Sequence, residues 1–303
     1  MDPTYQQSGH FHTSGSSNSQ DMIPELSSSS VYSLPNSAST AFGPGNVFGG
    51  MFPDLAFTCS DQTVYYVHRH HLSRISTNAF AGLLTNAAFS ISVLEPATVL
   101  NTVIHTIYGM SCTHHNPSLD TIEAVLVALV KYGLAPHFYA VPSRPIYPLL
   151  LLHAPHQPID AYALAGKYSL EDAAVTISGH LLAFDLWRIT DELSIKMGPV
   201  YLRRLVDLHR DRANALKSIA LRPPSNHPPT LMCGEMSQAR LINAWAFAAA
   251  QLAWATLPSM STNALQSTFE KAGKEIVCDD CWAALRARIQ EVCWQWSEVK
   301  RTI

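Results

Sequence analysis

All strand-like patterns in this chain lie between residues 54 and 94, and every later apolar pattern has the spacing of a helix. The stretches 54–59 and 63–67 are rich in β-branched and aromatic residues, and the polar turn at 60–62 separates them, which predicts a hairpin. A third short strand is expected at 91–94. A chain with a few early strands followed only by helices belongs to the α+β class.

The helical patterns differ from the strands in length and in period. Two short helices are expected at 68–75 and 78–84. A longer one begins at Glu95-Pro96, with proline in its first turn, and ends near Tyr108. The later helices are expected at 119–132, 159–167, 170–183, 200–219, 237–255, 263–272 and 278–300. Prolines between these stretches mark the linkers.

Residues 1–50 are rich in Ser, Gly, Asn and Gln and show no apolar period, which predicts a disordered tail. The first Lys or Arg is Arg69, so we expect no signal peptide, which would start with such residues. No apolar run is long enough to span a bilayer. The 6 cysteines are too sparse for a disulfide scaffold. We therefore expect an intracellular protein, in the nucleus or cytoplasm, without a membrane partner.

The charge balance and the motifs argue against several classes of function. Lys and Arg number 20 against 23 Asp and Glu, a net charge of -3, so no nucleic-acid partner is expected. The chain has no GxGxxG after a strand, no phosphate-binding GxxxxGK[ST], no GxSxG and no HExxH. The sequence therefore predicts no enzyme, no small-molecule substrate and no cofactor.

Four residues in the C-terminal part have the chemistry of a metal site. Cys278 and Cys281 form a CxxC at the start of the last expected helix, and Cys233 and His227 lie upstream. A single CxxC is half of the usual zinc signature. The sequence thus leaves open a zinc site with three cysteines and one histidine, or thiols packed near a helix end. We expect the second, and hence no metal.

An ordered set of residues between Asp54 and Tyr108 resembles the BTB/POZ family. The matching positions are Asp54, Tyr65, His68-Arg69, Leu72, Ser76, Phe80, Ile91 and Ile107-Tyr108-Gly109. The chain after residue 50 also resembles a group of basidiomycete fungal BTB-containing proteins of unassigned function. The resemblance implies a small sheet capped by helices at 51–185, with an insertion at 135–158. An all-α C-terminal region would then occupy 186–303.

The same resemblance implies roles for individual residues. Asp54 and Arg69 match an acid–base pair that lies near the dimer interface of repressor-type BTB domains. His68 would be structural, and the core would contain Leu72, Phe80 and Tyr108. These expectations make the chain a protein–protein interaction module that forms a homodimer and recruits protein partners of unknown identity.

Two other functions stay open. The first is a substrate adaptor of a cullin-type ubiquitin ligase. Family members with that role carry a hydrophobic–x–Glu element, and the corresponding stretch 86–92 contains no Glu. The second is a metal-dependent or cryptic enzyme in the helical half, for which the sequence provides no catalytic motif.

Overall fold

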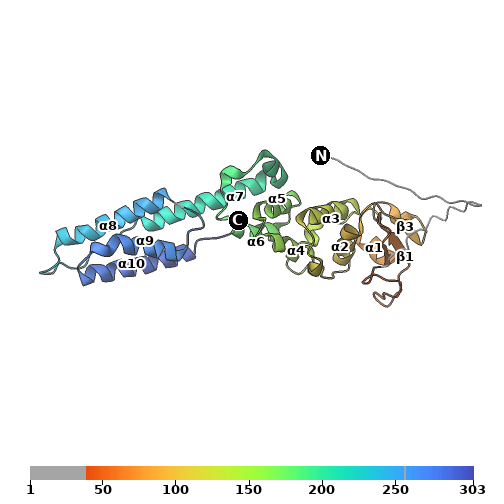
Figure 1. Ribbon diagram of the computed structural model, residues 1–303, viewed down its shortest axis with the longest axis horizontal. Coiled ribbons are helices and arrows are strands. Elements are labelled where there is room, and N and C mark those ends of the chain that lie inside the picture. The colour runs from red at the N-terminus through yellow and green to blue at the C-terminus, as the bar shows by residue number, and fades with distance from the viewer. Residues whose placement is uncertain (1–38, 256) are drawn as a thin grey trace, which may run out of the picture. The chain divides into compact units, whose positions relative to one another are not determined.

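The computed structural model describes residues 39–255 and 257–303 of the chain (Figure 1). Over these residues the protein is mixed α+β, mostly helical with one small three-stranded sheet, which confirms the predicted class. Most of the predicted tail, residues 1–38, lies outside the described residues. In the part of the chain that the structure describes, no helix is both long and apolar enough to cross a membrane.

The sheet contains β1 (Leu55–Thr58), β2 (Val64–Val67) and β3 (Ser90–Ser92), in the order β2-β1-β3. β1 and β2 form the predicted antiparallel hairpin, whereas β3 runs parallel to β1. The starts of β1 and β3 and the end of β2 therefore lie at the same end of the sheet. Helix α1 (Arg69–Ile75) begins at this end.

The other elements are helices. The α-helices after α1 are α2 (Ala97–Ile107), α3 (Leu119–Lys131), α4 (Ile146–His153), α5 (Pro158–Lys167), α6 (Glu171–Ser178), α7 (Asp191–Ala220), α8 (Glu235–Trp254), α9 (Thr262–Ala272) and α10 (Asp279–Ser297). Short 3-10 helices are η1 (Leu83–Thr85), η2 (Thr113–His115), η3 (Pro136–Phe138), η4 (Gly179–Leu181), η5 (Leu186–Arg188) and η6 (Gly273–Glu275). Every helix that the periodicity predicts after residue 95 is present, although the ends shift.

Buried apolar side chains form two clusters. The first contains side chains from Phe42 to Leu208, together with Ile303, and includes the sheet and α2 to α6. The second runs from Leu216 to Trp296 and unites the end of α7 with α8, α9 and α10, which lie side by side in Figure 1. The change between clusters falls inside α7, after the predicted boundary at 185. The reason is that α7 packs on α5 and also on α8 and α10.

Residues 39–50, which the sequence assigned to the disordered tail, pack against the sheet. Phe42 is fully buried. The Ser39 N–H donates to the carbonyl oxygen of Val64 at 2.9 Å, and the Tyr66 N–H donates to that of Phe42 at 2.8 Å. The predicted boundary at residue 50 is therefore wrong for these residues. The segment has no periodic pattern of apolar residues, but one buried ring and two backbone hydrogen bonds attach it to the fold.

The predicted insertion at 135–158 contains α4, which the sequence did not predict. Pro145 precedes this helix and Pro148 lies in its first turn, where a missing N–H has no effect on the hydrogen bonds of the helix. Leu149 and Leu150 are fully buried in the first cluster. The segment is therefore part of the core, although its prolines resemble those of a linker.

Candidate metal centre and the predicted interaction residues

His68 and Tyr108 join the start of α1 to the end of α2. His68 is 2% exposed. Its Nε2 lies 3.0 Å from the carbonyl oxygen of Met51, which can only accept, so Nε2 carries the proton. Nδ1 then accepts from the Tyr108 hydroxyl at 2.9 Å, and this hydroxyl accepts the backbone N–H of His68. Burial raises the pKa of Tyr108 to about 12, so the hydroxyl keeps its proton. This geometry fits the structural role expected for His68.

Asp54 and Arg69 lie next to each other in space, but their side chains form no ion pair in the part of the chain that the structure describes. Oδ1 of Asp54 accepts the backbone N–H of Arg69 at 2.7 Å. The Arg69 guanidinium instead donates to the carbonyl oxygens of Leu84, Asn86 and Ala88, at distances from 2.8 to 3.0 Å. The two residues come together as predicted, but Asp54 holds the start of α1 and Arg69 fixes the loop before β3.

Phe80 and Leu72 are buried, as expected for core residues. The Phe80 ring stacks on Tyr132 at a centroid distance of 4.0 Å. The helix predicted at 78–84 is wrong, because Ala79, Phe80 and Ala81 have positive φ angles of 52–57°. The Asn78 side chain accepts the N–H of Ala81 at 2.8 Å, which stabilises a left-handed turn in its place.

Four potential metal ligands converge at the N-terminus of α10. His227 and Cys233 belong to the segment between α7 and α8, Cys278 precedes α10, and Cys281 lies in its first turn. Their ligand atoms all lie within 4.8 Å of one another. The Sγ atoms of Cys233 and Cys281 are 3.7 Å apart, and Sγ of Cys278 is 3.4 Å from Nε2 of His227. The sequence named these four residues, and the structure brings them together.

The three thiols have different surroundings. Cys233 and Cys281 are each 1% exposed, whereas Cys278 is half-buried. The backbone N–H of Cys281, in the first turn of α10, lowers the pKa of the Cys278 thiol to about 7. Burial raises the pKa of Cys281 to about 12 and also raises that of Cys233. A helix N-terminus favours negative charge, so this position suits thiolate ligands.

Backbone and side-chain contacts orient His227. Its Nδ1–H donates to the carbonyl oxygen of Pro228 at 2.7 Å, which leaves the lone pair of Nε2 directed to a different partner. The amide of Gln238 in α8 donates to the carbonyl oxygen of His227 at 2.9 Å. Gln238 is 3% exposed, and no sequence pattern indicated its role, because a single Gln on a helix is ordinarily a surface residue.

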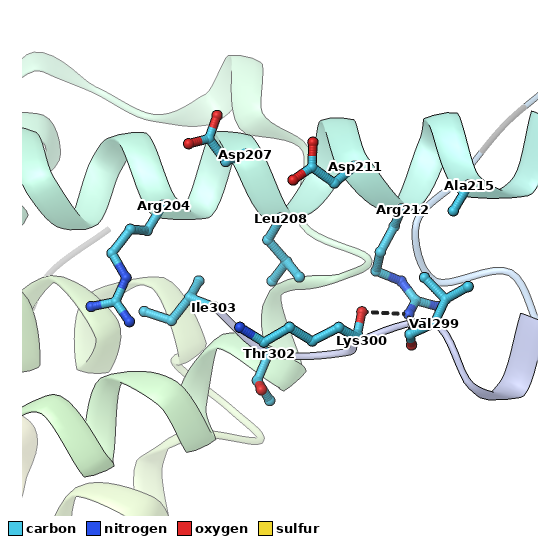
Figure 2. Close-up of a pocket in the computed structure, with 10 residues that line it drawn as sticks. All are labelled: Arg204, Asp207, Leu208, Asp211, Arg212, Ala215, Val299, Lys300, Thr302 and Ile303. Atoms are coloured by element: carbon cyan, nitrogen blue, oxygen red, sulfur yellow. Dashed lines mark hydrogen bonds between the residues drawn. The ribbon is translucent and has the colours of Figure 1, made fainter.

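A cavity of about 500 Å³ lies between α7 and the last residues of the chain (Figure 2). Arg204, at one end, is bound by the carboxylate of Glu171 at 2.7 and 2.8 Å. Arg212 is 2% exposed and donates to the carbonyl oxygens of Pro258, Val299 and Lys300. Both arginines in this wall thus bind groups of the protein itself, Arg204 a carboxylate and Arg212 three backbone carbonyl oxygens.

Comparison with known proteins found no match among protein-family models, curated proteins or solved structures. The resemblance to the BTB/POZ family therefore rests on the sequence pattern alone, chiefly on the residues between Asp54 and Tyr108.

Proposed function

We propose that the chain is an intracellular protein–protein interaction module that forms a homodimer through its α/β unit and has no catalytic activity. The observation that carries this proposal is a group of exposed apolar side chains around Asp54 and Arg69, here called the apolar end of the sheet. It consists of Phe48, Met51, Phe52 and Phe89, which are 37%, 46%, 71% and 57% exposed.

The strand arrangement places these four positions at the same end of the sheet. Phe52 precedes β1 and Phe89 precedes β3, and these two strands are parallel neighbours. The Phe89 carbonyl oxygen accepts the N–H of Ala56 in β1 at 2.7 Å. Phe48 and Met51 are joined by a backbone bridge just ahead of Phe52. Exposed apolar groups gathered in this way are typical of protein interfaces.

Arg69 supports this surface. Its three hydrogen bonds hold the loop 84–88, which leads directly to Phe89. A fixed loop loses little conformational entropy when its aromatic side chain is covered, so this clamp favours association. A second copy of the chain is the proposed partner, because the resembled family forms dimers next to the residues that match Asp54 and Arg69.

Other observations are consistent with this role. All six cysteines are free thiols, which suits a reducing compartment such as the nucleus or cytoplasm. In the cluster of His227 and the three cysteines, the protein supplies four ligands and leaves no open position for a substrate, in contrast to catalytic zinc sites. We therefore do not favour the metal-dependent enzyme, and the absence of Glu from 86–92 argues against the ubiquitin-ligase adaptor.

Sedimentation equilibrium of the full chain tests the dimer. We expect a molar mass twice the 33.3 kDa of the chain at tens of micromolar. A Phe52→Ser and Phe89→Ser double variant should be a monomer with an unchanged circular dichroism spectrum. The control is Phe138→Ser, at a position that is 66% exposed and outside the apolar end of the sheet, and it should stay a dimer. A monomeric wild type, or a double variant that still dimerises, would contradict the proposal.

A further inference from the structure

We propose that His227, Cys233, Cys278 and Cys281 bind one Zn²⁺ ion as a structural site of the C-terminal helices. Zinc binding by these residues is independent of dimerisation, because Cys233 and Cys281 lie in the second core cluster, whereas the strands that carry the apolar end of the sheet lie in the first. In the described part of the chain, no other group of three or more His, Cys, Asp or Glu side chains has this geometry.

The distances between ligand atoms match a zinc tetrahedron. Zn–S bonds of about 2.3 Å and a Zn–N bond of about 2.0–2.1 Å imply edges of about 3.8 Å between sulfurs and about 3.5 Å between sulfur and nitrogen. The observed distances are 3.7 Å for Cys233 to Cys281 and 3.4 Å for Cys278 to His227. The widest pair, at up to 4.8 Å, needs a shift of about 1 Å to reach the same edge.

The donor atoms select the class of metal. Three thiolates and one imidazole are soft ligands that favour zinc over the hard cations calcium and magnesium, which prefer oxygen. Asp279 and Asp280 lie between Cys278 and Cys281 but are exposed, and neither is in the converging set. The set carries one net negative charge with zinc, and the N-terminus of α10 lies where it can offset that charge.

Hydrogen bonds within the protein hold His227 and Cys233 in place. The Nδ1–H of His227 is held by the Pro228 carbonyl oxygen, the arrangement that typically orients a zinc-binding histidine. Cys233 and Thr230 exchange two backbone hydrogen bonds, at 3.0 and 3.2 Å, which close a tight turn below the cysteine. A cavity of about 470 Å³, lined by Cys278, Cys281 and Arg240, opens onto the site and gives the ion a path.

The site explains how an irregular segment is held. Residues 221–234 connect α7 to α8 with no helix or strand, although helix–helix connections commonly have roughly 2–8 residues. A metal bound to His227 and Cys233 fastens this segment to α10, whose ligands lie 48 and 51 positions along the chain. Such a crosslink makes the folding of α8 to α10 depend on the metal.

A disulfide is the competing chemistry. The Sγ atoms of Cys233 and Cys281 are not bonded at 3.7 Å, and all three cysteines of the cluster are free. Oxidation of any two of them would remove two ligands and abolish zinc binding. The purification must therefore be carried out under reducing conditions.

Metal analysis of the full chain, purified with a reductant and without a polyhistidine tag, tests the site. We expect about one equivalent of zinc in wild type. Cys278→Ser should lose most of this zinc, whereas Cys293→Ser should keep it, because Cys293 is a free thiol on the same helix but outside the cluster.

A chelator experiment keeps the test valid where a variant fails to fold. Removal of zinc from wild type should lower the melting temperature by roughly ten degrees or more, and addition of Zn²⁺ should restore it. The proposal is overturned by wild type that neither contains nor takes up zinc and melts at the same temperature with and without Zn²⁺. Zinc retained in full by Cys278→Ser would also overturn it.

Discussion

Nε2 of His227 lies 3.4 Å from Sγ of Cys278, although 51 positions separate the two residues. The contact joins an irregular connection to the start of the last helix. Two further thiols, Cys233 and Cys281, complete the group and belong to the second core cluster. Potential metal ligands therefore join the segment between α7 and α8 to the start of α10. Aromatic side chains fill the interior between the helices, and Trp245 and Phe269 stack there with a centroid distance of 3.8 Å.

Substitution of Phe42 tests whether residues 39–50 are part of the fold. Phe42→Ala should lower the free energy of unfolding by about 3–5 kcal/mol, because a fully buried ring is replaced by a cavity. Phe138→Ala, at a 66% exposed position, should change it by no more than about 0.5 kcal/mol. Urea unfolding of both variants measures the difference. Equal stability of the two variants would show that residues 39–50 belong to the disordered tail that the sequence predicted.

Substitutions of Arg69 and Asp54 separate a loop clamp from a charge pair. Arg69→Met removes the donors to the carbonyl oxygens of Leu84, Asn86 and Ala88, and should cost about 1–3 kcal/mol in unfolding free energy. Asp54→Asn keeps an oxygen that accepts the Arg69 N–H, so we expect a loss below about 1 kcal/mol. A loss as large for Asp54→Asn as for Arg69→Met would indicate a true ion pair.

Gly133 and Gly109 provide a matched test of the left-handed turn that presents Phe80. Both glycines have positive φ, 72° and 69°, so alanine at either should cost about 1–2 kcal/mol in backbone strain. At Gly133 a Cβ would also lie 2.5 Å from Oδ1 of Asn78, whereas nothing lies within 4 Å at Gly109. Gly133→Ala should therefore be less stable than Gly109→Ala by about 1–3 kcal/mol in thermal unfolding. Equal losses would show that Asn78 is free to move.

Local pattern predicted most of the helices and the hairpin. The stretch 119–132 has apolar residues at helical spacing and Ser118 just before it, and the structure places α3 there with Ser118 as its N-cap. The spacing of apolar residues shows which face of a helix or strand is buried, so it predicts an element well when several apolar residues line that face. The same reasoning fails at Phe42, because a single anchoring ring in a Ser- and Gly-rich segment has no period.

The candidate site was predictable in its parts but not in its assembly. The CxxC of Cys278 and Cys281 is visible in the sequence, and a helix start brings both thiols to one side. The approach of Cys233 and His227 depends on how α8 packs on the other helices, which no local pattern contains. The left-handed turn at 79–81 was missed for a similar reason. The Asn78 side chain accepts the N–H of Ala81 within the turn and also donates to the carbonyl oxygen of Lys131, which is far away in the sequence.

X-ray absorption at the zinc edge of the purified full-length protein tests the metal centre most directly. The proposed site predicts three sulfur neighbours at about 2.3 Å and one nitrogen neighbour at about 2.0–2.1 Å from the metal. Substitution of His227 by Ala should remove the nitrogen contribution of the imidazole and leave the three sulfurs. A first shell made only of nitrogen and oxygen atoms, without sulfur, would show that zinc binds elsewhere and that these three thiols belong to the core alone.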